Sequence, residues 1–369
     1  MQRYVKSLLS SLLTALVVVT VAAPTQAQTA PTVSGGDQGA LQSATQSLTP
    51  ERLSALEAIA RDTWHFYDYS SPTHNADIDP NTGLPRDNIG FYGAPAQGNY
   101  TSPTNIGVYL WSIIAAQDMG LINRPEALAR LNKTITTVER LRKWNGFLLS
   151  WYDTTNGHCL TGPGGADCEY SPLTGQFISN VDNGWYGAGL VVTRQALGDT
   201  QCRDCRDLAR RASALLTAMN YGTFYDSGDQ CQDITAGQMY GGWIVDHGPA
   251  GFHYGLLNTE TRITAYMGIG THTMPGDVWW RTWRTLPTTN PPHPPTGCAI
   301  DTANFDWQGQ YPPHGYYTTY NDPQSGHPFI VLEGHYVYTG TVAYGDVHFV
   351  PSWGGSQFEK SFPKKVYAK

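Results

Sequence analysis

The stretch "SNVDNGWYGAGL" (Ser179–Leu190) decides how this chain folds. Its polar head carries Asp182 and runs into a small-residue segment, and this pattern predicts a helix over 179–197. The glycines at 184, 187 and 189 would let neighbouring helices approach its backbone closely. Asp182 has two interpretations: it caps the helix, as carboxylates in a first turn commonly do, or it faces a ligand.

Further helices are predicted on both sides of this stretch. The first begins at Thr49, a suitable N-cap, with Pro50 at the first helical position. Its apolar stripe consists of Leu53, Leu56, Ile59 and Ala60. The other predicted helices span 103–119, 124–143, 203–219, 258–270 and 275–284.

The connections between these helices alternate in length. Short links join 119 to 124 and 197 to 203, whereas long loops rich in Gly, Asn, Asp and aromatic residues occupy 69–102, 144–178 and 220–257. Helical hairpins with long loops at one end are what an α/α toroid would produce. Beyond Pro287, short alternating runs such as "HPFIVLEGHYVYTGTV" predict strands. The expected fold class is therefore mainly α, with toroid-like helical hairpins, long aromatic loops and short C-terminal strands.

The amino-terminal segments have the composition of targeting and linker sequences. Residues 1–27 combine Arg3, Lys6, an apolar run and a small-residue exit, which is typical of a secretory signal peptide. Residues 28–48 are small and polar and predict a disordered linker, which leaves 49–369 as a single domain. We expect a secreted or periplasmic protein that has no membrane segment once the signal peptide is removed.

Charge and aromatic content point to the class of ligand. Without the signal peptide the chain has 21 basic and 30 acidic residues, a net charge of −9, so nucleic acid is not an expected partner. Charged residues make up 14% of the chain against roughly 25% in typical proteins, while aromatic residues reach 12%. Such a surface suits neutral, hydroxyl-rich ligands, because aromatic rings stack on sugar faces without needing a charge. The expected partner is an oligo- or polysaccharide substrate.

The six cysteines predict disulfide bonds in an exported chain. Cys159 and Cys168 flank a Gly-rich loop that a local bridge could close, whereas the pairing of the other four stays open. These four are Cys202, Cys205, Cys231 and Cys298. The motif "CRDC" could also be half of a metal site, but no second such motif or paired histidines accompany it. We expect neither a metal nor a cofactor.

Three predicted helices begin with related polar heads, in "YTSPTNIGVYL", "SNVDNGWYGAGL" and "LLNTETRITAYMGIG". If these are the inner helices of a toroid, their amino ends and the long loops open on one rim, where their polar side chains would converge. The converging residues would be Asn105, Asp182, Asn183, Asn258, Glu260 and Arg262. Trp185 could form the wall of a sugar subsite. The alternative is that the acidic heads only cap their helices.

Other candidate residues lie in the loops and strands. Asp153 follows Trp151 and Tyr152 at the end of an apolar run, and Glu333 lies in a predicted strand. Cleavage of a glycosidic bond needs a carboxylic acid of raised pKa as proton donor and a second carboxylate as base or nucleophile. His253 lies in a long loop, where a histidine most often has a structural role, but it remains a candidate for substrate binding.

Five motifs in the same order resemble the glucoamylase-like carbohydrate-active family. They are "NYTSPTNIGVYLWSIIAAQDMGLI", "GFLLSWYDTTNG", "ISNVDNGWYGAGLVV", "FHYGLLNTETRITAYMGIG" and "VPSWGGSQFE". This broad group includes endo-β-1,2-glucanases and the glucoamylase-like domain of cyclic β-1,2-glucan synthases. The resemblance runs from about residue 50 to Glu359.

This resemblance implies an (α/α)6 toroid that hydrolyses or transfers glucan-like chains at a carboxylate-lined cleft. Asp153, Asp182 and Glu260 lie inside the matching motifs, and Glu333 lies in a weaker match. Such a toroid has twelve helices, whereas about seven are predicted here, and the "WGGSQFE" motif leads into a short basic tail. We therefore expect an incomplete toroid that is shortened at its carboxyl end.

The function predicted from these features is that of an exported glycoside hydrolase acting on a β-glucan or a related bacterial polysaccharide. Glu260 is the first choice as proton donor and Asp182 is the next, as base or as orienter of water; Asp153 and Glu333 are the further catalytic candidates. Residues predicted to bind substrate are Asn105, Asn183, Arg262, His253, Trp151, Tyr152, Trp185 and Trp353. The alternative is a non-catalytic carbohydrate-binding remnant. A polysaccharide lyase is disfavoured, because few basic residues lie near the motifs.

Overall fold

The structure is a computed structural model. It describes residues 49–68, 77–88, 98–198, 201–228, 236–255 and 259–282, together with the backbone of three strands between 317 and 338. Several predictions lie outside the described residues. These are the signal peptide, the linker and the residues Cys231, Asn258, Cys298, Glu333 and Trp353.

Each predicted helix has a counterpart among the described residues. The helices are α3 (Pro50–Trp64), α4 (Pro103–Asp118), α5 (Arg124–Arg140), α6 (Asn180–Gly198), α7 (Arg203–Thr217), α8 (Thr261–Gly270) and α9 (Val278–Arg281), with a short 3-10 helix at Tyr221–Phe224. A mainly helical fold is thus confirmed for this part of the chain. No helix within the described ranges is long and apolar enough to cross a membrane.

The end of α5 is a correction to the predicted range of 124–143. The helix stops at Arg140, and Lys143–Trp144 (β2) pairs with Phe147–Leu148 (β3) in an antiparallel hairpin. Asn145 and Gly146, at the turn, have φ values of 47° and 84°. An Asn-Gly pair favours this tight turn because both residues tolerate the left-handed conformation. The predicted helix at 275–284 is likewise shorter, with only α9 formed.

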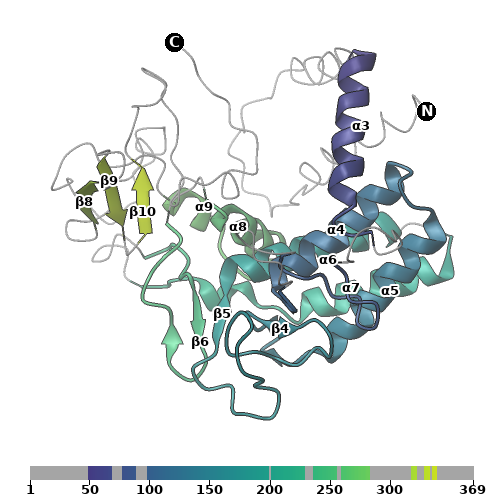
Figure 1. The fold of residues 1–369 in the computed structure, drawn as a ribbon. Coiled ribbons are helices and arrows are strands. Elements are labelled where there is room, and N and C mark those ends of the chain that lie inside the picture. Colours follow the sequence, from purple (N-terminus) through teal and green to yellow (C-terminus); the bar gives the residue numbers. More distant parts are fainter. Residues whose placement is uncertain are drawn as a thin grey trace, which may run out of the picture.

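Helix α6 packs against both α4 and α8 (Figure 1). Its glycines permit this contact: a Cβ atom added at Gly189 would lie 2.3 Å from the carbonyl oxygen of Gly107 on α4. On the other side, a Cβ atom at Gly184 would lie 2.5 Å from the hydroxyl oxygen of Thr264 on α8. That hydroxyl donates to the carbonyl of Asn180 at 3.0 Å. The predicted close packing around the glycines is confirmed, and the starts of the three helices lie near one another, since Thr104 contacts Asp182 and Trp185 contacts Glu260.

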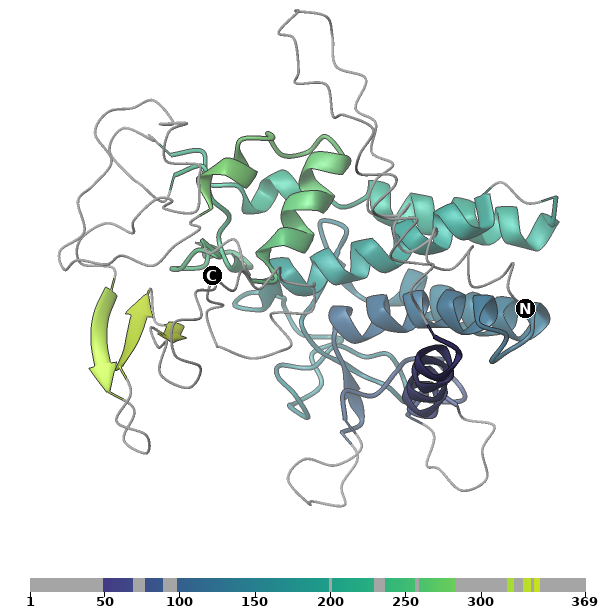
Figure 2. The ribbon, with the colours of Figure 1, turned by 90° about the horizontal axis from the view of Figure 1, so that it is seen from above.

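Helices α5 and α7 form a second layer beside α4 and α6, as the view from above shows (Figure 2). Arg211 of α7 donates to both carboxylate oxygens of Glu139 on α5, at 2.8 and 2.7 Å, and to the side-chain oxygen of Asn132 at 2.7 Å. Successive helices along the chain thus alternate between the two layers, as the helical hairpins of a toroid do. Closure of the hairpins into a ring stays a prediction.

Short strands lie at the amino ends of the inner helices. Strand β1 (Tyr100–Thr101) precedes α4 and pairs with β4 (Tyr152–Asp153). Strand β5 (Phe177–Ser179) runs into α6 and pairs with β6 (Gly242–Ile244), which pairs with β7 (Gly248–Pro249). A separate antiparallel sheet has the order β10 (His335–Tyr338), β9 (Pro328–Leu332), β8 (Tyr317–Asn321), which confirms the predicted C-terminal strands.

Helix α3 projects from the helical layers (Figure 1). Its predicted cap is confirmed, because the Thr49 hydroxyl accepts from the N–H of Arg52 at 3.3 Å. Its apolar stripe remains largely open to solvent, with Leu56 50% and Ile59 61% exposed. Only its last residue, Trp64, is buried, with the guanidinium of Arg130 5.2 Å from the ring centroid.

Candidate functional site at the amino ends of the inner helices

The three inner helices use hydroxyl groups to bind their first N–H groups. The Ser102 hydroxyl accepts from the N–H of Asn105 at 3.3 Å, and the Ser179 hydroxyl accepts from the N–H of Asp182 at 3.3 Å. At α8 the Thr259 hydroxyl accepts from the N–H of Thr261 at 3.2 Å. Glu260 occupies the N-cap position there, but its side chain makes no capping hydrogen bond. The Glu260 side chain therefore does not cap α8, and the Ser179 hydroxyl takes the N–H of Asp182. Asp182 still lies in the first turn of α6, where a carboxylate favours the helix dipole.

The Asp182 carboxylate lies between α4 and α6 and accepts a hydrogen bond from the Thr104 hydroxyl. Burial raises the pKa of Asp182 above its ordinary range, and the nearby Asp87 carboxylate adds to the increase. Hydrogen bonds from Ser179 and Thr104 oppose it, because they stabilise the charged form. The net direction is a raised pKa, which is the direction that a proton donor requires.

Asp87 is a site residue that sequence reasoning missed. Its carboxylate accepts from the side-chain amide of Asn105 at 2.8 Å and from that of Asn88 at 3.3 Å. The Asn88 amide also donates to the Tyr100 hydroxyl at 3.0 Å. Asp87 belongs to the long loop before α4, and its position next to Asp182 depends on how that loop folds back. The one sequence signal was the loop itself, since functional residues concentrate in such segments.

Glu260 is held by the inner helix beside it. The indole N–H of Trp185 on α6 donates to the Glu260 carboxylate at 3.0 Å. Trp185 is only 9% exposed, so it serves as an orienting donor more than as an open sugar platform. Arg262 is partly buried two residues further on, and burial lowers the pKa of its guanidinium group. The structure thus brings Asn105, Asp182 and Glu260 to neighbouring helix ends, as predicted for a common rim.

Two predicted substrate-binding residues lie in the core. The Asn183 amide is fully buried and bonds the N–H and carbonyl of Leu148, at 2.9 and 3.0 Å, and the carbonyl of Ser179 at 2.9 Å. The Tyr152 hydroxyl is equally buried, accepting from the N–H of Leu149 at 2.7 Å and donating to the carbonyl of Arg142 at 2.6 Å. Asn183 ties β3 to α6, and Tyr152 joins the two ends of the β2–β3 hairpin, so neither is carried into the proposed site.

Asp153 forms a local turn. Its carboxylate accepts from the N–H and the hydroxyl of Thr155, at 2.7 and 2.6 Å. This is the turn that Asp side chains commonly build in loops, and it gives Asp153 a structural role. The neighbouring Trp151 is partly buried and packs edge-on against Tyr100, with ring centroids 5.4 Å apart. Trp151 therefore lies next to the Asp87 network.

His253 is buried in the loop that precedes α8. Its Nε2 atom lies 3.0 Å from the Asp226 carboxylate, and its ring lies 4.7 Å from that of Tyr240. These contacts tie together the two sides of the long loop, so we assign His253 a structural role.

The cysteines of the described residues form two disulfides, Cys159–Cys168 and Cys202–Cys205. The predicted local bridge is confirmed. The "CRDC" sulfurs are joined to each other in this structure. Within the described ranges, no cluster of three His, Cys, Asp or Glu side chains is arranged to hold a metal ion.

Comparison with known proteins gave one curated relative and several solved structures. The chain is 30% identical over 168 residues to the cyclic β-(1,2)-glucan synthase NdvB of Rhizobium meliloti, a match that covers 45% of this chain and 5% of the synthase. The chain therefore spans only a small part of that relative. No family model matches the chain.

The solved structures are similar over about half of their length or less. A β-1,2-glucanase from Parabacteroides distasonis is 20% identical, with a TM-score of 0.48 over 64% of this chain and 30% of that one. An endo-β-1,2-glucanase from Chitinophaga pinensis, solved with sophorotriose and glucose, is 16% identical, with a TM-score of 0.47 over 78% and 56%. The resemblance predicted from the motifs is confirmed: the proteins similar to this chain are a cyclic β-(1,2)-glucan synthase, glucoamylase-like proteins and endo-β-1,2-glucanases.

Proposed function

We propose that this protein is an exported glycoside hydrolase that cleaves a β-glucan at the amino ends of α4, α6 and α8. The observation that carries the proposal is that the Ser179 and Thr259 hydroxyls accept N–H groups at the starts of α6 and α8, next to the carboxylates of Asp182 and Glu260. Each carboxylate is instead held by a side chain from a neighbouring helix, Thr104 or Trp185. Helix caps that had no further role would not need these contacts.

Asp182 is the better proton donor of the two. Its pKa is raised by burial and by Asp87, and a general acid needs a proton near neutral pH. Glu260 then supplies the second carboxylate, as base or nucleophile, with the Trp185 indole fixing its direction. This reverses the order of roles favoured by the sequence, because burial and charge proximity are set by the fold.

Asn105, Arg262 and Trp151 are the proposed substrate contacts. Asn105 and Arg262 lie in the first turns of α4 and α8, where hydrogen-bond donors would meet sugar hydroxyls. Trp151 lies against Tyr100 beside the Asp87 network and could extend an aromatic surface along the rim. The curated relative is a β-1,2-glucan synthase, so β-1,2-glucan is the first substrate to test.

The test is incubation of the mature protein with β-1,2-, β-1,3- and α-1,4-glucans and an arabinan, with products identified by mass spectrometry. We expect oligosaccharides from β-1,2-glucan, and their loss in Asp182→Asn and Glu260→Gln. Glu57→Gln on the exposed face of α3 is the matched control and should retain full activity. Products that persist in both site variants would remove these carboxylates from the mechanism.

The roles are separated with an aryl glycoside of a β-1,2-linked disaccharide. A good leaving group needs no protonation, so the variant lacking the acid should keep far more activity on this compound than the variant lacking the second carboxylate. If Glu260→Gln keeps its activity on the aryl glycoside and Asp182→Asn loses it, Glu260 is the proton donor and Asp182 is the second carboxylate. A folded protein that binds β-1,2-glucan but yields no product would support the carbohydrate-binding alternative.

A further inference from the structure

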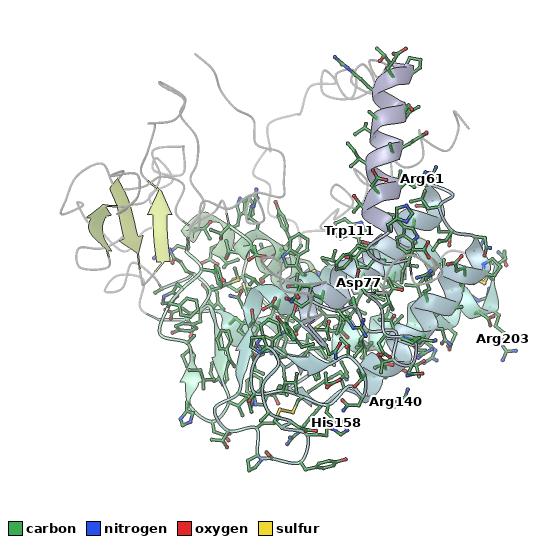
Figure 3. The ribbon with its side chains drawn as sticks, in the orientation of Figure 1. Arg61, Asp77, Trp111, Arg140, His158 and Arg203 are labelled. Atoms are coloured by element: carbon green, nitrogen blue, oxygen red, sulfur yellow. A yellow bond between two sulfur atoms is a disulfide. The ribbon has the colours of Figure 1, made fainter. Side chains whose placement is uncertain are left out.

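The motif "CRDC" opens α7 at the end of the helical layers away from the candidate site. Cys202 is the N-cap of α7, and its sulfur accepts from the N–H of Cys205 at 3.2 Å. Arg203 between them is labelled in Figure 3, where it lies at the edge of the molecule. The proposed hydrolase does not use this end of the fold.

The two sulfurs differ in accessibility. Cys205 is fully buried in the core, whereas Cys202 is partly exposed at the start of the helix. A thiolate from solution can therefore reach Cys202 and not Cys205. Thiol–disulfide exchange requires this kind of access, because the attacking thiolate approaches one sulfur and displaces the other.

The buried sulfur has a cationic partner. The guanidinium of Arg124, at the start of α5, donates to the Cys205 sulfur at 3.1 Å. A guanidinium and the amino end of a helix both stabilise a thiolate over a thiol, and a stabilised thiolate is a better leaving group. The surroundings thus favour release of Cys205 when Cys202 is attacked.

We propose that Cys202–Cys205 is a thiol–disulfide exchange site that a dithiol reduces and an oxidised dithiol regenerates. One thiolate of the dithiol attacks the Cys202 sulfur, the Cys202–Cys205 bond breaks, and Cys205 leaves with the electron pair as a thiolate beside Arg124. The second thiolate of the dithiol then attacks its own sulfur in the mixed disulfide and releases Cys202. Two electrons pass to the protein, and the dithiol becomes a disulfide.

The other disulfide provides an internal comparison. Cys159 and Cys168 are 0% and 1% exposed, and the N–H of Cys168 donates to the carbonyl of Cys159 at 2.8 Å. Neither sulfur is open to attack by a thiolate from solution. The same chain therefore carries one exchangeable disulfide and one inert one, and a single experiment can compare them.

The first experiment treats the folded full chain with dithiothreitol, alkylates samples over time and maps the labelled peptides by mass spectrometry. We expect Cys202 and Cys205 to be labelled at least about 10-fold faster than Cys159 and Cys168. Arg124→Gln should slow that labelling, whereas Arg210→Gln, which removes an exposed arginine of α7, should not. Equal rates for the two disulfides, or no effect of Arg124→Gln, would overturn the proposal.

The second experiment uses single-cysteine variants and oxidised glutathione. In Cys205→Ser, the Cys202 thiolate should attack glutathione disulfide, forming a mixed disulfide and releasing one reduced glutathione. In Cys202→Ser, Cys205 should react at least about 10-fold more slowly because it is buried. Peptide mapping assigns the modified cysteine. Faster modification of Cys205 than of Cys202 would contradict the proposed direction of attack.

Discussion

Helices α6 and α3 are of similar length, 19 and 15 residues, yet their surroundings differ almost completely. In α6 the side chains from Asn183 to Leu190 are all buried, whereas in α3 the only buried residue is Trp64. The sequence of α3 has a recognised cap and an apolar stripe, while α6 contains four glycines, which lower helix propensity. Close contact with neighbouring helices therefore determines which helix organises the fold, and local propensity does not.

The largest effect is expected where the backbones of α4 and α6 touch. In Gly189→Val the new Cβ atom would lie 2.3 Å from the carbonyl oxygen of Gly107, and α7 and α8 prevent α6 from moving away. We expect a loss of at least about 3 kcal/mol in the free energy of unfolding, measured by chemical denaturation. In Gly198→Ala the added Cβ atom meets nothing within 4 Å, so this control should leave stability nearly unchanged. Equal stability of the two variants would show that the helices do not meet at these glycines.

Asn183→Ala tests the buried amide of α6. The variant leaves the N–H and carbonyl of Leu148 without their side-chain partner, so we expect a loss of about 2–3 kcal/mol by chemical denaturation. Asn132→Ala, at an exposed position of α5, also removes a hydrogen bond, the one from Arg211. It should change the free energy of unfolding by no more than about 0.5 kcal/mol. Unchanged stability in Asn183→Ala, combined with weaker glucan binding, would instead favour the predicted substrate contact.

Asp182→Asn should change how stability depends on pH. Because burial raises the pKa of Asp182 in the folded protein, the folded state holds a proton that the unfolded state has lost. That stabilising contribution is present below the unfolded pKa of about 3.9 and disappears as pH rises through the higher folded pKa. The Tm of Asp182→Asn relative to the unmodified protein should therefore increase with pH over this window.

Thr104→Val sharpens the same measurement. The Thr104 hydroxyl stabilises the charged carboxylate, so its loss should move the window to higher pH. A Tm difference between Asp182→Asn and the unmodified protein that stays constant from pH 3.5 to 7.5 would show that Asp182 has no raised pKa.

The smallest effect is expected on α3. Leu56 is 50% exposed, so Leu56→Ala should change the free energy of unfolding by no more than about 0.5 kcal/mol. Leu190→Ala, the same substitution at a fully buried position of α6, should cost about 2–5 kcal/mol. Similar losses at the two positions, measured under the same conditions, would mean that the stripe of α3 is packed in solution.

Much of the helical framework was predictable because it depends on local signals. The N-caps Thr49, Ser102 and Asn123 each accept a hydrogen bond from an N–H three residues further on, and Gly120, with a φ of 71°, follows the end of α4. The Asn145-Gly146 turn was equally readable, yet the predicted helix was extended to residue 143, into the strand that leads to this turn. A tight turn signal of this kind should have ended the predicted helix earlier.

The candidate site was predictable only in part. The amino ends of α4, α6 and α8 could be grouped from their similar heads. The contacts of Trp185 with Glu260 and of Thr264 with Asn180 agree with the expectation that α6 and α8 start close together. Asp87 was missed because it is about 95 positions away in sequence from Asp182, the residue whose pKa it raises. Tyr152 and Asn183 were misread because a polar side chain beside an aromatic one looks the same in a sequence whether it binds a sugar or a backbone carbonyl.

The sequence by itself determined where the helices begin, which segments form loops, that Cys159 and Cys168 could bridge, and which family's motifs the chain carries. These features depend on neighbouring residues: caps, turns, periodicity and short spacings. Only the tertiary structure decided that Ser179 caps α6 while Asp182 faces Thr104, that Asp87 raises the Asp182 pKa, and that Cys205 is buried beside Arg124 while Cys202 is open. Burial, charge proximity and access depend on which distant segments pack together, and no local pattern contains that information.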